Sequence, residues 1–153
     1  MNIFAHARTN TTDSLTAHEI RLIVESYELI SVGRRFAQKF YARLFEQAPE
    51  IRALFADDLT LQVTKLTDML AALVGKLDDP IELANLLHAL GERHRGYGVD
   101  ARHFAPVGRA LFETLETEIG PRFDGATRRA WISLYALATS WMHPPADDHE
   151  SLW

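Results

Sequence analysis

The sequence predicts an all-α protein with one domain. Apolar residues recur at spacings of three and four along most of the chain, which is the period of amphipathic helices. No segment alternates apolar and polar residues for long enough to indicate a sheet. The length of 153 residues suits a single domain. We expect a flexible segment over residues 1–14, a helical domain over 15–143 and a flexible tail over 144–153.

The first helices are predicted from a cap and from apolar spacing. Thr16 and Glu19 have the form of a capping box. The helix that follows carries Ile20, Ile23, Tyr27 and Ile30. Gly33 interrupts this pattern, and the second helix has on one side Phe36, Phe40, Leu44 and Phe45. Pro49 suits the first position of a short third helix, which carries Ile51, Leu54 and Phe55.

The middle of the chain predicts two longer helices. Asp57 and Asp58 supply a turn before a helix over about 59–76, whose inward residues are Leu66, Met69, Leu70, Leu73 and Val74. The Asp-Asp-Pro run at 78–80 ends this helix and starts the next one. The next helix carries Ile81, Leu83, Leu86, Leu87 and Leu90. Its end is expected at three glycines, Gly91, Gly96 and Gly98.

Two further helices complete the expected fold. Asp100 is a candidate cap for a helix that carries Phe104, Val107, Leu111, Leu115 and Ile119. Gly120 and Pro121 end that helix. The last helix runs over about 127–142 and turns inward Trp131, Leu134, Tyr135, Ala138 and Trp141. The Pro-Pro pair at 144–145 ends it.

Composition excludes several classes of function. The chain has no Cys, which rules out disulfides, thiol nucleophiles, iron–sulfur clusters and thiolate zinc sites. Its formal net charge of −5 disfavours a general nucleic-acid interface. The apolar run over 69–74 is far too short to cross a bilayer, so we expect no membrane partner. No secretory signal pattern opens the chain, and a cytoplasmic location is the default expectation.

The sequence lacks the short motifs of several enzyme classes. It contains no Gly-rich phosphate loop, no GxSxG and no HExxH. Its His residues form no pair four residues apart, so a metal site built from protein ligands alone is not expected. We expect the following His residues to face solvent: His88, His103, His143 and His149.

One group of residues does indicate a candidate functional site. His94 ends the helix after Pro80, and Gln62 lies on the preceding long helix. Leu66 is four residues after Gln62 and therefore on the same face. Two aromatic residues lie upstream, Tyr41 on a helix and Phe55 at a helix end.

Four segments around these residues resemble the globin family. They are Lys39-Phe-Tyr-Ala-Arg-Leu-Phe45, Ala48-Pro-Glu-Ile-Arg-Ala-Leu-Phe55, Leu90-Gly-Glu-Arg-His-Arg-Gly-Tyr-Gly-Val99, and Ala130-Trp131 with Tyr135. The similarity is closest to bacterial single-domain globins and to the haem domains of flavohaemoglobins. The spacings from Tyr41 to Phe55 and from Gln62 to His94 agree with that pattern, whereas the interval from Phe55 to Gln62 is shorter.

The resemblance implies a globin fold, a three-over-three helical sandwich around haem b. His94 would ligate the iron, and the Leu90 carbonyl would accept a hydrogen bond from the other imidazole nitrogen. Phe55 would pack on the porphyrin, and Lys65 would pair with a propionate at the mouth of the pocket. The remaining contacts would come from Leu66, Leu90, Val99, Phe104 and Val107.

The resemblance also implies a site for dioxygen. Tyr41 and Gln62 would face the sixth position of the iron and donate hydrogen bonds to the ligand. Each bond would contribute on the order of 1–2 kcal/mol, about tenfold in affinity. No His lies between 59 and 76, so ligation by two His is not expected, while Tyr41 or Lys65 as an internal sixth ligand stays open.

The chain departs from flavohaemoglobins on the side of the proximal His. The family's Tyr that backs this His falls on Phe104, and its Glu falls near Asp148. We therefore expect no relay that makes the imidazole more anionic, and peroxidase-like chemistry is disfavoured. The chain is also too short to contain flavin and nicotinamide domains, so turnover would need a separate reductase.

Three functions fit these expectations. The first is reversible dioxygen binding for storage, delivery or scavenging, with nitric oxide and carbon monoxide as other ligands. The second is a nitric oxide dioxygenase that depends on a separate reductase. The third is a haem-based gas sensor, and a haem-free helical bundle is the alternative to all three. The oligomeric state, monomer or homodimer, stays open.

Overall fold

The computed structural model describes residues 15–96, 98–99 and 101–142. The flexible ends predicted over 1–14 and 144–153 lie outside the described residues. So do three candidate features of the sequence, the cap Asp100, the helix stop Pro144-Pro145 and the acidic position Asp148, together with His143 and His149.

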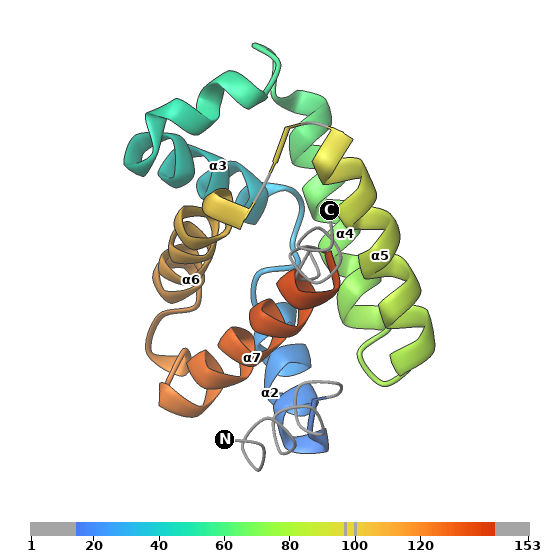
Figure 1. Cartoon of the computed structure of the whole chain (residues 1–153). Coiled ribbons are helices and arrows are strands. Elements are labelled where there is room, and N and C mark those ends of the chain that lie inside the picture. Colours follow the sequence, from blue (N-terminus) through green and yellow to red (C-terminus); the bar gives the residue numbers. More distant parts are fainter. Residues whose placement is uncertain (1–14, 97, 100, 143–153) are drawn as a thin grey trace, which may run out of the picture.

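Within the described ranges the chain forms six α-helices and three short 3-10 helices, with no strand (Figure 1). The all-α prediction is confirmed. The α-helices are α2 (Ala17–Glu28), α3 (Arg35–Gln47), α4 (Thr60–Gly75), α5 (Pro80–Gly96), α6 (Phe104–Ile119) and α7 (Gly125–Met142). The 3-10 helices are η1 (Pro49–Leu54), η2 (Ala101–His103) and η3 (Gly120–Arg122).

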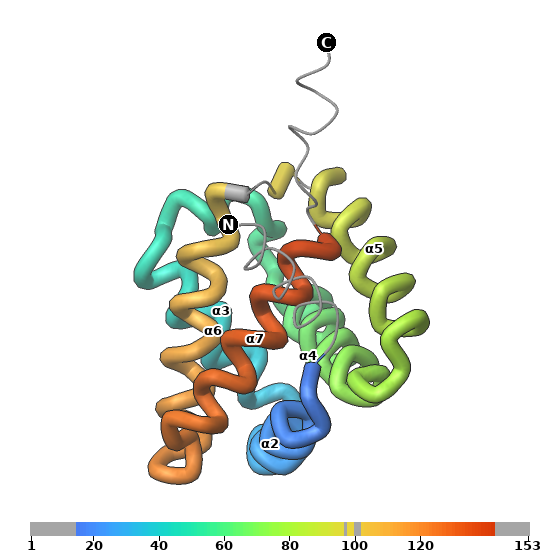
Figure 2. The backbone as a smooth tube through the Cα atoms, turned by 60° about the horizontal axis from the view of Figure 1, so that its bottom comes forward, coloured from blue at the N-terminus to red at the C-terminus, as the bar shows by residue number. Residues whose placement is uncertain are grey.

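The helices pack as pairs around a central space. Figures 1 and 2 both show α3 beside α6 on one side and α4 beside α5 on the other, with α7 between the two pairs. Contacts join α3 to α6 and to α4, while α7 packs on α2, α5 and α6. This arrangement brings side chains from five different helices toward one another.

Short polar side chains start the helices largely as predicted. The Thr16 hydroxyl accepts from the Glu19 N–H at 3.0 Å, and the Glu19 carboxylate accepts from the Thr16 N–H at 2.9 Å. Asp79 accepts from the Glu82 N–H at 3.2 Å at the start of α5. Asp124 caps α7 by accepting from the Thr127 N–H at 2.9 Å, a cap that the sequence analysis did not identify. These bonds satisfy N–H groups that the first helical turn leaves unpaired.

The core joins distant parts of the chain. Trp131 on α7 is 2% exposed, and its indole N–H donates to the Ser26 hydroxyl on α2 at 2.8 Å. Ile23, Leu87 and Leu115 are fully buried. Burying an aliphatic side chain of this size stabilises the fold by about 1.5–3 kcal/mol.

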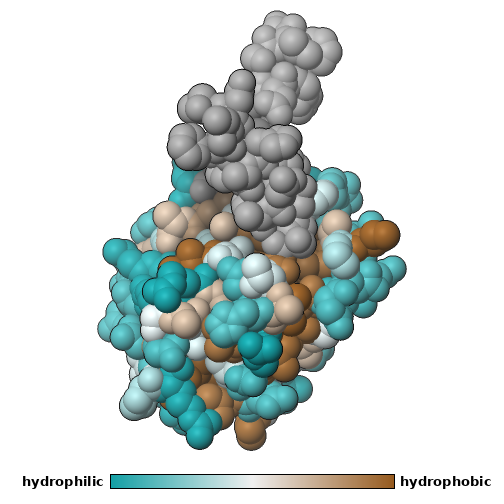
Figure 3. Space-filling view, turned by 90° about the horizontal axis from the view of Figure 1, so that it is seen from below, coloured by the Kyte–Doolittle hydropathy of each residue, from teal (hydrophilic) through white to brown (hydrophobic). Residues whose placement is uncertain are grey.

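The outer surface mixes polar and apolar residues. Seen from below in Figure 3, apolar residues lie among polar ones over the visible face. Among the described residues the most exposed large apolar side chains are Val32, Ile81 and Leu61. Ile81 lies in the first turn of α5, so not every apolar residue of this helix faces the core.

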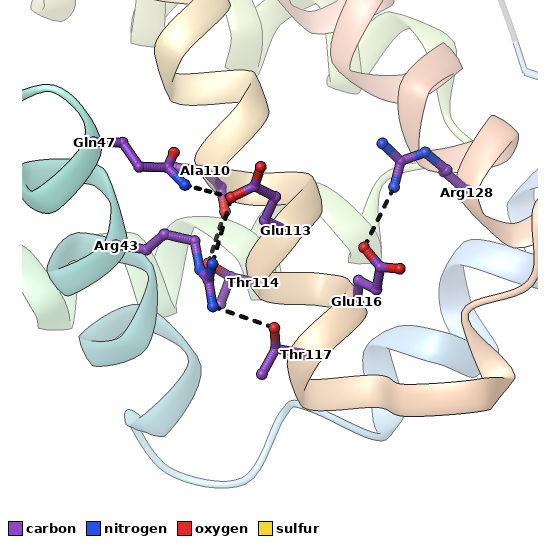
Figure 4. A network of polar contacts seen from close by, with 8 residues as sticks. All are labelled: Arg43, Gln47, Ala110, Glu113, Thr114, Glu116, Thr117 and Arg128. Carbon is purple, nitrogen blue, oxygen red and sulfur yellow. Dashed lines mark hydrogen bonds and ion pairs between the residues drawn. The ribbon is translucent and has the colours of Figure 1, made fainter.

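A polar network covers the outside of the α3–α6 interface (Figure 4). Glu113 on α6 accepts from the side chains of Gln47 and Arg43, and Arg43 also donates to the Thr117 hydroxyl at 3.2 Å. The Gln47 bond, followed by the Arg43 bond and charge, holds the pKa of Glu113 below its ordinary value. The network therefore links α3 to α6 on the side that faces solvent.

Of the three glycines predicted to end α5, Gly96 is its last residue, while the prediction for Gly91 is wrong. Gly91 lies inside α5 and is buried, because the helix continues to Gly96. A Cβ at position 91 would lie 2.1 Å from the Met142 carbonyl oxygen at the end of α7. The glycine therefore permits a close approach of two helices, and it does not break the helix. Arg95, one turn later, donates to the same carbonyl at 2.7 Å.

We expect Gly91→Ala to lower the free energy of unfolding by about 2–3 kcal/mol, because the added methyl group forces α5 and α7 apart. Gly75→Ala is the matched control. A Cβ at position 75 meets no atom within 4 Å, so its effect should stay within about 1 kcal/mol. Urea unfolding measures both variants, and equal stabilities would contradict the close approach.

Candidate functional site

The central space is a cavity of about 360 Å³ lined by α3 to α7, η1 and η2. This volume lies in the range of roughly 300–1,000 Å³ that is common for small-molecule sites. All ten site residues predicted from the sequence line it: Tyr41, Phe55, Gln62, Lys65, Leu66, Leu90, His94, Val99, Phe104 and Val107. Most of the lining is apolar, and a few polar groups stand among it.

His94 reaches the cavity from the last turn of α5. Its Nδ1 atom lies 2.7 Å from the Leu90 carbonyl oxygen, one turn back on the same helix. A carbonyl can only accept, so Nδ1 carries the proton and Nε2 carries the lone pair. Burial lowers the pKa of the imidazole, the Leu90 bond partly opposes this shift, and the nearby Arg93 charge lowers it further. His94 is therefore a neutral imidazole with a defined tautomer at neutral pH.

Tyr41 and Gln62 form a second polar group in the cavity. The Gln62 side-chain amide donates to the Tyr41 hydroxyl at 3.1 Å, which joins α3 to α4. Burial raises the pKa of Tyr41, and the bond from Gln62 only partly opposes this. The phenol therefore keeps its proton at neutral pH. Because its oxygen accepts from Gln62, the hydroxyl can donate its own proton to a ligand.

Aromatic rings hold Tyr41 in place. The ring centroid of Tyr41 lies 5.0 Å from that of Phe40, 5.5 Å from that of Phe55 and 5.8 Å from that of Phe45. Phe45 and Phe55 meet edge to face at 5.2 Å. Such pairs favour particular angles between rings, and each adds about 0.5–1.5 kcal/mol beyond simple burial.

Tyr135 is a cavity residue that the sequence analysis assigned only to the core. Its hydroxyl donates to the Phe104 carbonyl at 2.5 Å, and burial raises its pKa. A Cβ at Gly108 would lie 2.7 Å from the Tyr135 ring, so a glycine is needed there. The position of Tyr135 four residues after Trp131 placed it on an inward face. That spacing could not show that this part of the face borders a cavity.

The prediction for His103 is wrong. It was expected to face solvent, yet it is half-buried and lines the cavity from the 3-10 helix η2. His88 is exposed as predicted, and its ring lies 5.7 Å from that of Trp141. Periodicity separates the faces of a long helix, but it says little about a three-residue helix next to a turn.

The described residues contain no group of three His, Asp or Glu side chains that could hold a metal ion. In the part of the chain that the structure describes, no helix combines the length and apolarity needed to cross a membrane.

Comparison with protein families identifies the fold. The model of the family described as Globin matches residues 38–142. The chain belongs to the globin family. Membership implies a haem cofactor and a diatomic gas as ligand, as the sequence resemblance predicted. The predicted globin fold is confirmed as well.

Similar proteins include neuroglobins of fish. The neuroglobin of Dissostichus mawsoni is 31% identical over 116 residues, covering 67% of this chain and 73% of that protein. The neuroglobin of Danio rerio is 29% identical over 147 residues, covering 85% of this chain and 91% of that protein. Likeness to bacterial single-domain globins or to flavohaemoglobin haem domains stays a prediction for this globin.

A solved structure supports the fold alone. A hemoglobin component (TA-VII) from Tokunagayusurika akamusi superposes with a TM-score of 0.76 at 22% identity. The match covers 86% of this globin and 95% of that chain.

Proposed function

We propose that this globin binds haem b through His94 and binds dioxygen reversibly at the iron. The observation that carries the proposal is the pairing of two polar groups in one apolar cavity. One is the imidazole whose tautomer the Leu90 carbonyl determines, and the other is the Tyr41–Gln62 pair.

The chemistry of the cavity lining suits an iron porphyrin. Neutral imidazole is a common axial ligand of haem iron, and its second nitrogen is normally held by an acceptor such as the Leu90 carbonyl. When bound, the haem supplies an iron atom with a sixth position for a diatomic gas. The proposed apolar contacts around it come from Phe55, Leu66, Leu90, Val99, Phe104 and Val107. Lys65 is exposed at the cavity, where its ammonium group can pair with a haem propionate.

Tyr41 and Gln62 then determine how strongly dioxygen is held. The Tyr41 hydroxyl donates to the ligand, and the Gln62 amide orients that hydroxyl. The apolar walls exclude water, which strengthens each of these bonds. A donor of this kind contributes on the order of 1–2 kcal/mol, and slow release favours scavenging or storage over delivery.

Nitric oxide dioxygenase activity is a second candidate. The Tyr41 hydroxyl, oriented by Gln62, favours it because this donor would stabilise negative charge on a diatomic ligand. Haem held by His94 would supply the one electron that nitric oxide and dioxygen need to form nitrate. A separate reductase must return that electron after each turnover.

His94→Ala should abolish stable haem retention, because the variant lacks the axial nitrogen. The haem-to-protein ratio after gel filtration, from the absorption spectrum, measures this. His88→Ala is the matched control, since His88 is an exposed histidine on the same helix. A normal haem content in His94→Ala would refute the assignment.

Tyr41→Phe should accelerate dioxygen release about tenfold, because one donor is lost while the ring and its aromatic contacts remain. Stopped-flow displacement of dioxygen by carbon monoxide measures the rate. Tyr27→Phe should leave the rate unchanged, since Tyr27 does not line this cavity. An unchanged rate in Tyr41→Phe would mean that the phenol does not donate.

Turnover separates the two candidate functions. If the globin is a dioxygenase, cell extract with NADH should reduce the ferric protein within seconds and sustain nitric oxide consumption. If it is a dioxygen carrier or scavenger, a single equivalent of nitric oxide should be consumed and reduction should take many minutes. A nitric oxide electrode follows both cases.

A further inference from the structure

The Arg52 guanidinium binds three consecutive backbone carbonyls. Its Nη1 atom donates to the carbonyls of Phe55 at 3.3 Å and Ala56 at 2.9 Å, and Nη2 donates to that of Asp57 at 2.9 Å. A guanidinium is planar and has five donors in a rigid arrangement, which a lysine ammonium cannot reproduce. Arg52 therefore ties the chain after η1 back onto η1 itself.

These carbonyls belong to a turn with little support of its own. Residues 55–59 are neither helix nor strand, and they connect η1 to α4. At the start of the turn the Phe55 N–H donates to the Arg52 carbonyl at 3.1 Å. At its end the Asp58 carboxylate accepts from the Thr60 N–H at 2.9 Å. The Arg52 side chain supplies the bonds to the backbone between these two points.

The turn places two cavity residues. Phe55 begins the turn, and Gln62 lies in the first turn of α4, which starts at Thr60 just after it. A shift of the turn therefore moves both the Phe55 ring and the Gln62 amide. Because that amide donates to the Tyr41 hydroxyl, the shift also reaches the phenol.

A second route runs through Phe45. The guanidinium carbon of Arg52 lies 5.1 Å from the centroid of the Phe45 ring. That ring is stacked on Tyr41 at 5.8 Å and meets Phe55 at 5.2 Å. Arg52 thus contacts the outer side of the aromatic group whose inner side faces the cavity. A cation above an aromatic face is attracted to it, so Arg52 also limits the movement of Phe45.

We propose that Arg52 is a positioning residue for the donor pair Tyr41 and Gln62. It does not line the cavity, so it acts through the turn and through Phe45. The inference rests on the proposed dioxygen binding. It adds a residue outside the cavity that controls the rate of dioxygen release while haem retention stays normal.

Arg52→Lys tests the proposal, because lysine keeps the charge near Phe45 but lacks the planar guanidinium that donates to all three carbonyls. We expect dioxygen release to become about fivefold faster, which is less than for Tyr41→Phe because the phenol is still present. Arg43→Lys is the matched control. Arg43 bonds to Glu113 and Thr117 in the network of Figure 4, outside the cavity, and its replacement should leave the rate unchanged.

Two further measurements separate positioning from a general loosening of the fold. The stretching frequency of carbon monoxide on the ferrous protein reports the donors around the ligand, and it should rise in Arg52→Lys but not in Arg43→Lys. In a Tyr41→Phe background, Arg52→Lys should add little further acceleration. Equal acceleration by Arg52→Lys and Arg43→Lys, or an unchanged rate and frequency in Arg52→Lys, would overturn the proposal.

A measurement on haem-free protein tests the role of Arg52 independently of the proposed dioxygen binding. The NMR signal of the Gln62 side-chain amide in haem-free protein should shift in Arg52→Lys and stay in place in Arg43→Lys. If the wild-type protein retains no haem, the proposed function fails, while this signal still decides whether Arg52 positions Gln62. An unshifted Gln62 signal would refute the role of Arg52.

Discussion

The hydrogen bond between the His94 imidazole and the Leu90 carbonyl is the interaction on which the rest of the site depends. It determines which ring nitrogen carries the lone pair and holds the ring against its own helix. Both residues lie on α5, so the position of this bond in the molecule depends on the position of that helix. Gly91 lets α7 approach closely, Arg95 binds the last described carbonyl of α7, and Trp131 joins α7 to α2 through Ser26. The orientation of one imidazole thus rests on contacts that reach across the molecule.

The donor pair is supported in a different way. Tyr41 and Gln62 lie on different helices and are joined by a single hydrogen bond in a mostly apolar surrounding. The Tyr41 phenol stays protonated because burial disfavours its charged form. Its ring is held by the aromatic group around Phe45 and Phe55, which Arg52 contacts from outside. In this proposal the orientation of the Tyr41 hydroxyl therefore depends on Arg52, which does not line the cavity.

A carrier and a dioxygenase would use the same cavity, so the choice between them lies in electron supply and in the surroundings of the imidazole. Phe104 lines the cavity and carries no hydroxyl. Tyr135 comes close to this place, but its hydroxyl donates to the Phe104 carbonyl. The Tyr135 hydroxyl is therefore bonded to the backbone, and the proposed dioxygen binding does not use it.

The sequence by itself determined the helices, several of their caps and ten of the residues that meet in the cavity. Helical periodicity and capping are local, so Thr16, Glu19 and the inward faces of α4 and α7 can be read from neighbouring residues. The spacing of four motifs placed His94, Tyr41 and Gln62 together because a family pattern already encodes their distance in space. Only the tertiary structure decided the role of Gly91, the inward turn of His103, the cavity position of Tyr135 and the contacts of Arg52. Each of these depends on which backbone comes near from another part of the chain, and no local pattern of residues carries that information.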